Sequence, residues 1–197
     1  PVAILDEESA VTTIMAPPIA GELIFELSVF DNDSNESFDE VTITISGPTT
    51  IHDIQYTLEQ GSFCYDSEMN GEAVSVTGIV TAVETVYPNF YFQDFSYNSY
   101  SGIYAYNVSD EYSPQVGDEV VVSGVVNEYY SFTQITPVYE IDFLSNGNPV
   151  EITNISSGDI GSDPDGSGDC SLSGEALEGM LVRISNAVVV SEANEYG

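Results

Sequence analysis

The segment Gly71–Val80 reads GEAVSVTGIV, and Gly117–Val126 repeats its pattern as GDEVVVSGVV. A looser third copy, GMLVRISNAV, occupies Gly179–Val188. Valine and isoleucine recur in each copy with the two-residue period of a β-strand. The first two copies also carry an interior glycine, Gly78 and Gly124, at which a long strand can bend. The three segments predict curved β-sheet and favour a small barrel.

The rest of the chain follows the same two-residue period, and helix patterns are nearly absent. Short β-branched or aromatic runs are separated by turns of Gly, Pro, Asn and Asp. We therefore predict an all-β protein. The expected strands are Leu23–Phe30, Val41–Ile45, Val74–Val83, Phe90–Phe92, Ile103–Tyr106, Val120–Val126, Thr133–Ile135, Tyr139–Phe143 and Met180–Val190.

The order of these runs predicts five regions. Residues 1–46 supply too few strands to close a sandwich, and residues 47–50, Gly-Pro-Thr-Thr, predict a linker. Residues 51–155 suit a five-stranded Greek-key barrel, with the first two motif copies as its first and fourth strands. Residues 156–175 predict an acidic loop rich in Gly, Ser and Asp. Residues 176–197 predict the opening strand of a second repeat.

Charge is the extreme feature of the composition. The chain has 33 Asp and Glu residues against one Arg and no Lys, a formal net charge of −32. Phosphate backbones and anionic membrane surfaces would be repelled, so nucleic acid is not an expected partner. No run approaches the roughly 18 apolar residues of a membrane span, so no membrane insertion is expected. A saline, calcium-containing extracellular or cell-surface location would screen the repulsion between carboxylates.

The two cysteines, Cys64 and Cys170, are expected to form one disulfide in an exported protein. This bond would stabilise the fold by about 4–5 kcal/mol, because it closes a long loop. The alternative is two unpaired thiols. The sequence begins at Pro1 without an initiator Met or signal peptide, so we expect a processed product or a piece of a longer protein.

Two stretches resemble known families. IMAPPIAGELIFELSVFDNDSNESFDEVTITI (Ile14–Ile45) resembles the C-terminal half of PKD-like and related immunoglobulin-like modules of bacterial surface proteins. A second set of segments, from Ile51 to about Val190, is similar in its order to the OB-like domain of secreted bacterial multidomain proteins. The segments are IHDIQYTLEQ (Ile51–Gln60), VTGIVTAV (Val76–Val83), NFYFQDFS (Asn89–Ser96), SGIYAYN (Ser101–Asn107), VGDEVVVSGVVNEYYSFTQIT (Val116–Thr136) and LEGMLVRI (Leu177–Ile184). That domain is often found beside extracellular nuclease or lamin-tail domains. The resemblance implies an exported, modular and largely non-catalytic β-domain.

Two acidic loops are candidate calcium sites, because carboxylate and amide oxygens at alternate positions suit a hard cation with six to eight oxygen ligands. The candidate ligands are Asp163, Asp165 and Asp169 in one loop and Asp31, Asp33 and Asn35 in the other. The first loop lacks the distal Glu of an EF-hand. The alternative for both is a solvated turn, since Asp, Asn and Gly favour turns for backbone reasons.

Aromatic residues concentrate in the predicted barrel. Barrels of this type bind oligonucleotides or oligosaccharides on the face of their second and third strands, and exposed rings stack on bases or sugars. The candidate ligand-binding face consists of Tyr91, Tyr97, Tyr104, Tyr106 and Tyr129. Stacking without phosphate neutralisation is weak, so a carbohydrate or a protein is the expected kind of partner.

No catalytic residue is predicted. His52 is the single histidine, and a lone imidazole near a domain start is more often a structural hydrogen-bonding group than a general base. The sequence has no Ser/His/Asp set, zinc-binding His spacing or phosphate-binding glycine loop. The catalytic motifs of an endonuclease/exonuclease/phosphatase domain have no counterpart either.

Three functions stay open. The first is a structural or binding module of a secreted or cell-surface bacterial protein, in contact with other domains of its parent chain. The second is a subunit of an extracellular filament in which neighbouring copies exchange strands, because unpaired sheet edges template pairing with another chain. The third is a substrate-binding accessory domain of a secreted nuclease, which rests on family association alone.

Overall fold

A computed structural model describes residues 4, 9, 11–12, 14, 21–45, 48–60, 64–156, 158–160 and 170–188 of the 197-residue chain. The protein is all-β, as the two-residue period predicts, with two short helices among the described residues. It divides into two compact units, Pro1–Thr49 and Thr50–Gly197. In the part of the chain that the structure describes, every helix is too short or too polar to cross a bilayer.

The first unit is built on a long antiparallel hairpin of β1 (Gly21–Phe30) and β2 (Glu36–Ile45). The strands stay in register from the Gly21–Ile45 pair to the Phe30–Glu36 pair, without a bulge. A separate antiparallel bridge joins Ile4 and Ile14. β2 begins at Glu36, before the predicted strand start at Val41, because the polar residues at its beginning continue the ladder with β1.

Strand alternation gives the hairpin one mostly apolar face, because paired residues in a ladder share a face. The large apolar side chains of this face are Leu23, Phe25, Leu27, Val29, Val41 and Ile43. The opposite face mixes apolar and acidic residues, with Glu26 directly paired to Glu40. Leu27 is 66% exposed and Val41 is 56% exposed, so the hairpin forms no dry core of its own among the described residues.

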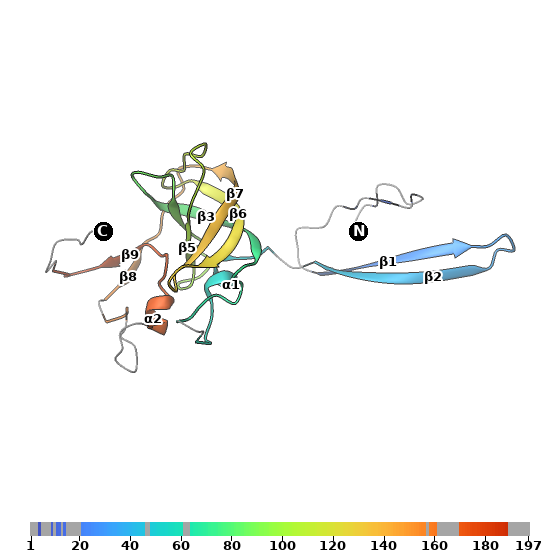
Figure 1. The fold of residues 1–197 in the computed structure, drawn as a ribbon, viewed down its shortest axis with the longest axis horizontal. Helices are drawn as coiled ribbons and strands as arrows, with labels where there is room; N and C mark the ends of the chain where they lie inside the picture. Colours follow the sequence, from blue (N-terminus) through green and yellow to red (C-terminus); the bar gives the residue numbers. More distant parts are fainter. Residues whose placement is uncertain are drawn as a thin grey trace. The chain divides into compact units, whose positions relative to one another are not determined.

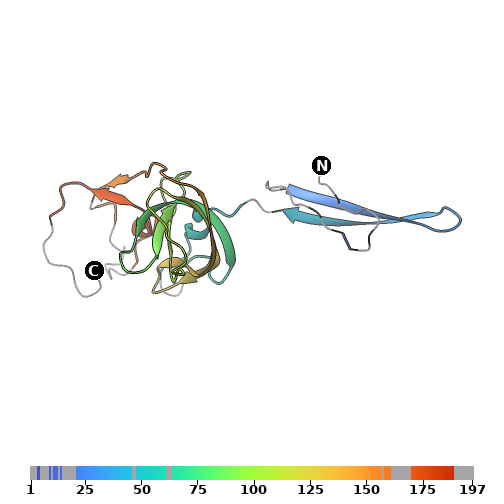
Figure 2. The same cartoon turned by 90° about the horizontal axis from the view of Figure 1, so that it is seen from above.

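The second unit is built on a closed barrel of five strands in the order β3-β4-β5-β7-β6 (Figures 1 and 2). The β5–β7 pair is parallel, and the other four pairs are antiparallel. This arrangement is compatible with an OB-like fold and has the first two motif copies as its first and fourth strands, as predicted. The strands are β3 (Ala73–Val83), β4 (Phe90–Gln93), β5 (Gly102–Ala105), β6 (Glu119–Glu128) and β7 (Thr133–Ser145).

Glycines of the repeated motif serve two purposes. The first glycine of every copy, Gly71, Gly117 and Gly179, has a positive φ of +91°, +91° and +67°, a conformation that other residues adopt only with strain. The interior glycines allow close approach: a Cβ on Gly78 would lie 2.8 Å from a ring carbon of Phe92. A Cβ on Gly124 would lie 2.5 Å from Ile135, and the β6–β7 register shifts on both sides of Gly124.

The barrel core is aliphatic and aromatic and comes from all five strands. A short helix, α1 (Ile51–Gln55), adds Ile51 and Ile54, both fully buried, and contacts β3 and β5. Thr50 caps α1 in a reciprocal capping box with Asp53. The core residues are Ile51, Ile54, Val74, Val76, Val80, Phe90, Phe92, Ile103, Ala105, Val108, Val120, Val122, Val126, Ile135 and Ile141.

One strand prediction was wrong. Thr133–Ile135 and Tyr139–Phe143 were expected as two separate strands. The structure has one continuous strand, β7, in which the Thr136–Pro137 peptide bond is cis. The β6–β7 ladder accommodates Pro137 at the register shifts around Gly124, so the chain does not need to leave the sheet.

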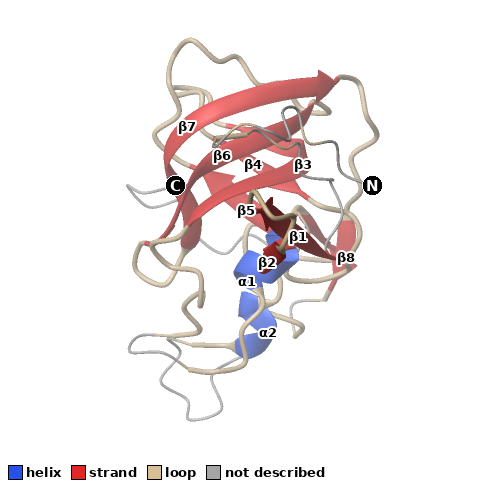
Figure 3. Ribbon diagram, turned by 90° about the vertical axis from the view of Figure 1, so that its right-hand side faces the viewer, coloured by secondary structure: helices blue, strands red, loops and turns tan. Residues whose placement is uncertain are grey.

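The C-terminal part of the second unit forms a strap that returns to the barrel. We use "strap" for residues 170–184, which contain α2 (Leu172–Glu175) and β9 (Val182–Ile184). β9 lies within the third motif copy and pairs in parallel with β8 (Thr153–Ile155). Figure 3 shows α1 and α2 below the barrel strands. The expectation that residues 176–197 open a second barrel stays a prediction.

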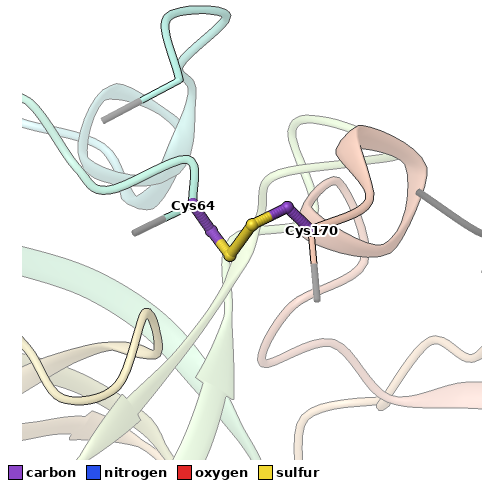
Figure 4. Close-up of a disulfide and its surroundings, with 2 residues drawn as sticks. All are labelled: Cys64 and Cys170. Carbon is purple, nitrogen blue, oxygen red and sulfur yellow. A yellow bond between two sulfur atoms is a disulfide. The ribbon is translucent and has the colours of Figure 1, made fainter. Parts of the chain in front are cut away.

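The predicted disulfide is present between Cys64 and Cys170, with a Cα–Cα distance of 5.3 Å. Figure 4 shows that it joins the segment after α1 to the segment before α2. The bond spans 106 residues of sequence. It therefore ties the start of the strap to the start of the barrel unit.

Candidate ligand-binding face

Four aromatic rings meet on the outer surface of β4 and β5. The ring of Tyr91 on β4 lies 4.6 Å from that of its ladder partner Tyr104 on β5. Phe132, just before β7, completes the group at 5.8 Å from Tyr104 and 6.4 Å from Tyr91. Tyr106 extends it at 6.0 Å from Tyr104 and is 47% exposed. We call Tyr91, Tyr104, Tyr106 and Phe132 the aromatic face.

Hydrogen bonds fix the centre of the aromatic face. The hydroxyl of Tyr104 donates to Oε1 of Glu84, and Nδ2 of Asn89 donates to Oε2 of the same carboxylate at 3.1 Å. Asn89 is held in turn by the backbone N–H of Val108, which donates to its Oδ1 at 3.2 Å. Burial, the hydrogen bond to Glu84 and the charge of Glu84 raise the pKa of Tyr104, so its hydroxyl stays protonated. The ring of Tyr104 is thereby held rigidly in place.

A cavity of about 410 Å³ opens beside this face. Tyr91 and Phe132 form its aromatic wall, while the strap closes the other side. Its lining residues are Thr81, Ala82, Tyr91, Phe132, Glu178, Gly179, Met180 and Leu181. The mixture of rings, aliphatic groups and a few polar atoms is typical of small-ligand sites.

Backbone contacts hold the strap in this position. Gly102 on β5 and Gly179 on the strap lie so close that a Cβ on either would come within 2.4–2.7 Å of the other's backbone. The backbone N–H of Leu181 donates to Oε1 of the buried Gln93 at 2.6 Å. The backbone N–H of Tyr100 donates to the carbonyl of Ala176 at 2.8 Å. The third motif copy therefore contributes a close-packing glycine to the cavity wall.

Carboxyl groups gather where the strap meets the barrel. Burial and the neighbouring charge of Glu175 raise the pKa of Glu178 to about 8, although the backbone N–H of Thr133 donates to its Oε1 at 2.9 Å. Burial and the charges of Glu128 and Asp66 raise the pKa of Glu175 to about 7. Glu178 is therefore mostly protonated at neutral pH. The cavity wall then offers an uncharged group that can both donate and accept a hydrogen bond.

The structure brings together three of the five tyrosines predicted to form a ligand-binding face: Tyr91, Tyr104 and Tyr106. Tyr97 instead stacks on His52 of α1, with ring centroids 4.1 Å apart, and His52 also stacks on Tyr56 at 5.1 Å. Tyr129 packs edge-on against Tyr130 in the β6–β7 turn, 4.8 Å away. His52 thus lies in an aromatic stack, and its expected role as a structural hydrogen-bonding group stays a prediction.

The acidic turn of the first unit is organised by its own hydrogen bonds. Oδ1 of Asp31 accepts from the backbone N–H groups of Asp33 and Asn35 at 2.8 and 2.9 Å, and Oδ2 accepts from Nδ2 of Asn35 at 2.8 Å. These bonds, chiefly those from Asn35, lower the pKa of Asp31. Calcium binding at this turn stays a prediction. The other predicted calcium loop, with Asp163, Asp165 and Asp169, lies outside the described residues.

Sequence reasoning missed three members of the site: Phe132, Glu84 and Glu178. Phe132 precedes its strand by one residue, so periodicity alone did not assign it to a face. Glu84 and Glu178 are two acidic residues among 33, and nothing in their local pattern distinguishes them. The sequence feature that could have pointed to Glu178 is its position directly before Gly179 of the third motif copy.

No protein-family model matches the chain, and no curated protein matches it. The fold itself defines the class of the protein: it is an all-β protein with a closed five-stranded barrel that carries an aromatic face and an adjoining cavity.

Proposed function

We propose that the chain is a non-catalytic β-module of a secreted or cell-surface protein, and that its barrel binds an uncharged, hydroxyl-rich ligand such as a glycan. One observation carries this proposal: the ring wall of Tyr91 and Phe132 borders a cavity whose polar groups include Glu178. Aromatic rings stack on the apolar faces of sugars, and carboxyl and hydroxyl groups hydrogen-bond their edges. The disulfide supports an oxidising location.

The charges around the site favour a neutral ligand. Burial and the neighbouring carboxyl groups of Glu84 and Glu178 raise the pKa of Tyr91. An anionic ligand would meet the carboxylate of Glu84 without any lysine in the chain to offset its charge. The nuclease-accessory function therefore ranks behind glycan binding.

Tyrosine fluorescence provides a direct binding assay, because the chain has 13 Tyr and no Trp. The protein should be titrated with a panel of neutral hexose and N-acetylhexosamine oligosaccharides. We expect saturable quenching by at least one of them, and a roughly tenfold weaker affinity for Tyr91→Ala, as for the loss of one stacking ring. Tyr139→Ala is the matched variant, since Tyr139 is 62% exposed on β7 and outside the aromatic face.

Two results would oppose the glycan proposal: no quenching by any sugar in the panel, or equal losses in Tyr91→Ala and Tyr139→Ala. Single-stranded DNA at physiological salt should be included as a separate titration. Binding of DNA, weakened by Tyr91→Ala, would favour the nuclease-accessory function instead.

The hairpin supports a second candidate function, a filament subunit. Its apolar face carries six large side chains, and each of β1 and β2 has a single strand neighbour among the described residues. A second copy's hairpin could cover that face or extend the two-stranded sheet. Size-exclusion chromatography and negative-stain microscopy at high protein concentration test this function. A monomer with and without calcium would eliminate it.

A further inference from the structure

A second cavity, of about 440 Å³, lies at the turn between β6 and β7. It shares no lining residue with the cavity of the aromatic face. The lining residues are Asp66, Asn70, Glu128, Tyr129, Tyr130 and Ser131. Two carboxylate residues, one amide residue and one serine thus border a single space with the two tyrosines, and carboxylate, amide and hydroxyl oxygens are ligands that hard cations prefer.

One oxygen of the Glu128 carboxylate accepts two hydrogen bonds, and the other has no hydrogen-bond partner. Its Oε1 accepts from the backbone N–H of Ser67 at 2.8 Å and from the hydroxyl of Thr133 at 2.7 Å. Its Oε2 is buried without a hydrogen-bond partner, and so is Oδ1 of Asp66. Buried carboxylate oxygens without a donor are costly, and native proteins usually satisfy them with water or an ion.

A third unsatisfied oxygen lies in the same region. Gln55 is 1% exposed, its Nε2 donates to the carbonyl of Gly102 at 2.6 Å, and its Oε1 has no partner. Gln55 lies near Glu178, which interacts electrostatically with Glu128. Among the described residues, the buried side-chain oxygens without a partner are those of Gln55, Asp66 and Glu128, and two of these three residues line this cavity.

Protein cations do not balance the carboxylates of Asp66 and Glu128. The chain has no lysine, and its single arginine, Arg183, is an exposed residue of β9. The hydrogen bonds from Ser67 and Thr133 supply partial positive charge only. A bound divalent cation would supply the missing charge and coordinate the unsatisfied oxygens.

We propose that Asp66 and Glu128 bind one calcium ion in this cavity, with Asn70, Ser131 and water completing its oxygen shell. Within the described ranges, no three Asp, Glu, His or Cys side chains are placed to hold a metal ion, so the site relies on two carboxylates and neutral ligands. Two carboxylates balance the charge of one calcium ion. Calcium suits this irregular set better than magnesium, which demands near-ideal octahedral geometry.

The ion would join two parts of the barrel unit that are distant in sequence. Asp66 lies two residues after Cys64 of the disulfide, whereas Glu128 ends β6 at the hairpin turn. Calcium at this position therefore stabilises the attachment of the 64–70 segment to the barrel. This ion site has its own lining residues, separate from those of the cavity beside the aromatic face.

Thermal unfolding in chelator and in increasing calcium tests the site. We expect calcium to raise the melting temperature of the barrel by roughly 5 °C at about 100 times its dissociation constant. Asp66→Asn and Glu128→Gln should lose most of that rise. The matched variants Asp142→Asn and Glu140→Gln, which change exposed acids of β7, should retain it. Asp31→Asn and a combined Asp163→Asn, Asp165→Asn and Asp169→Asn variant should retain it as well.

Sodium chloride at equal ionic strength separates screening from binding. The proposal is overturned if the salt reproduces the full rise, or if Asp66→Asn and Glu128→Gln respond to calcium like the wild type. Terbium luminescence at low temperature gives a second measurement for any variant of reduced stability. Tyr129 and Tyr130 line the cavity and should sensitise a bound terbium ion. A terbium signal equal in the wild type and in Asp66→Asn would likewise overturn the site.

Discussion

The barrel and the β1–β2 hairpin are composed in the same alternating pattern, yet they bury very different amounts of apolar surface. Val122 in β6 is fully buried, whereas Val41 in β2 is 56% exposed. Every barrel strand has two ladder neighbours, while β1 and β2 have one each among the described residues. Closure gives the barrel an inside, so one half of each alternating pattern becomes core.

The difference shows that alternation specifies strands but does not by itself specify a core. The barrel closes because Gly78 and Gly124 permit close approach and Gly71 and Gly117 adopt positive φ before β3 and β6. In the hairpin, residues 22–45 contain no glycine, and Gly21 lies at the very start of β1. A two-stranded hairpin is marginally stable alone, so its apolar face indicates an interaction surface.

Removal of the disulfide should cause the largest loss of stability in the barrel unit, and so reduce the difference in stability between the barrel and the hairpin the most. The double variant Cys64→Ser, Cys170→Ser releases a constraint across 106 residues and should lower the free energy of unfolding by about 4–5 kcal/mol. Denaturant unfolding followed by tyrosine fluorescence measures the change. Addition of reductant to the wild type should reproduce it, and an unchanged midpoint would show that the bond contributes nothing to the barrel.

A side chain at Gly124 should be the next most damaging change. Its Cβ would lie 2.5 Å from Cγ2 of Ile135 and 2.6 Å from the carbonyl oxygen of Pro137, so Gly124→Val forces β6 and β7 apart. We expect a loss of about 3 kcal/mol in the free energy of unfolding. Gly158→Ala is the matched variant, since its Cβ meets nothing closer than 3.9 Å. Equal stability of the two variants would contradict the closure argument.

Two matched valines compare the regions directly. Val122→Ala leaves a hole in the barrel core and should cost about 2 kcal/mol. Val41→Ala removes exposed surface from the hairpin and should change stability by less than about 0.5 kcal/mol in the monomer. Chemical denaturation of both variants at low protein concentration makes the comparison. A large loss for Val41→Ala would mean that the hairpin has a cooperative core.

The pH dependence of barrel stability should show a smaller effect. The folded-state pKa values of Glu175 and Glu178, about 7 and 8, exceed their ordinary value of 4.5. Their protonation therefore stabilises the fold fully below about pH 4.5, and this contribution is lost as pH rises through 7 and 8. Asp53 and Asp159 have lowered pKa values, so their contribution is lost as pH falls through the acid range.

We thus expect stability in chelator to be highest near pH 4.5, to decline as pH rises from there to about 8, and to level off above that. Thermal melts across this range measure it. Glu178→Gln should flatten the decline, whereas the exposed Glu140→Gln should not. A stability that rises from pH 6 to 9 would contradict the buried-carboxyl assignment.

Much of the fold follows from local pattern. The motif copies at Gly71 and Gly117 predict β3 and β6, because a glycine followed by alternating β-branched residues is typical of a turn that leads into a strand. The disulfide follows from the count of two cysteines. The single strand β7 could not be predicted, since the register shifts that accommodate Pro137 depend on contacts with β6.

The candidate sites were less predictable, because they depend on residues far apart in the sequence. Tyr91 and Tyr104 are ladder partners and could be paired from the strand order. Glu178 reaches the cavity only because Gly179 packs on Gly102. Asp66 and Glu128 meet through the bond from Ser67, and no spacing rule relates them.

Native-state hydrogen exchange of the dilute protein tests the central contrast most directly. The account predicts that backbone amides of β3 and β6 exchange only by global unfolding, whereas amides of β1 and β2 exchange with little protection. Protection of the β1–β2 amides that equals that of β6 in the monomer would contradict it, because the hairpin would then share a cooperative core with the barrel.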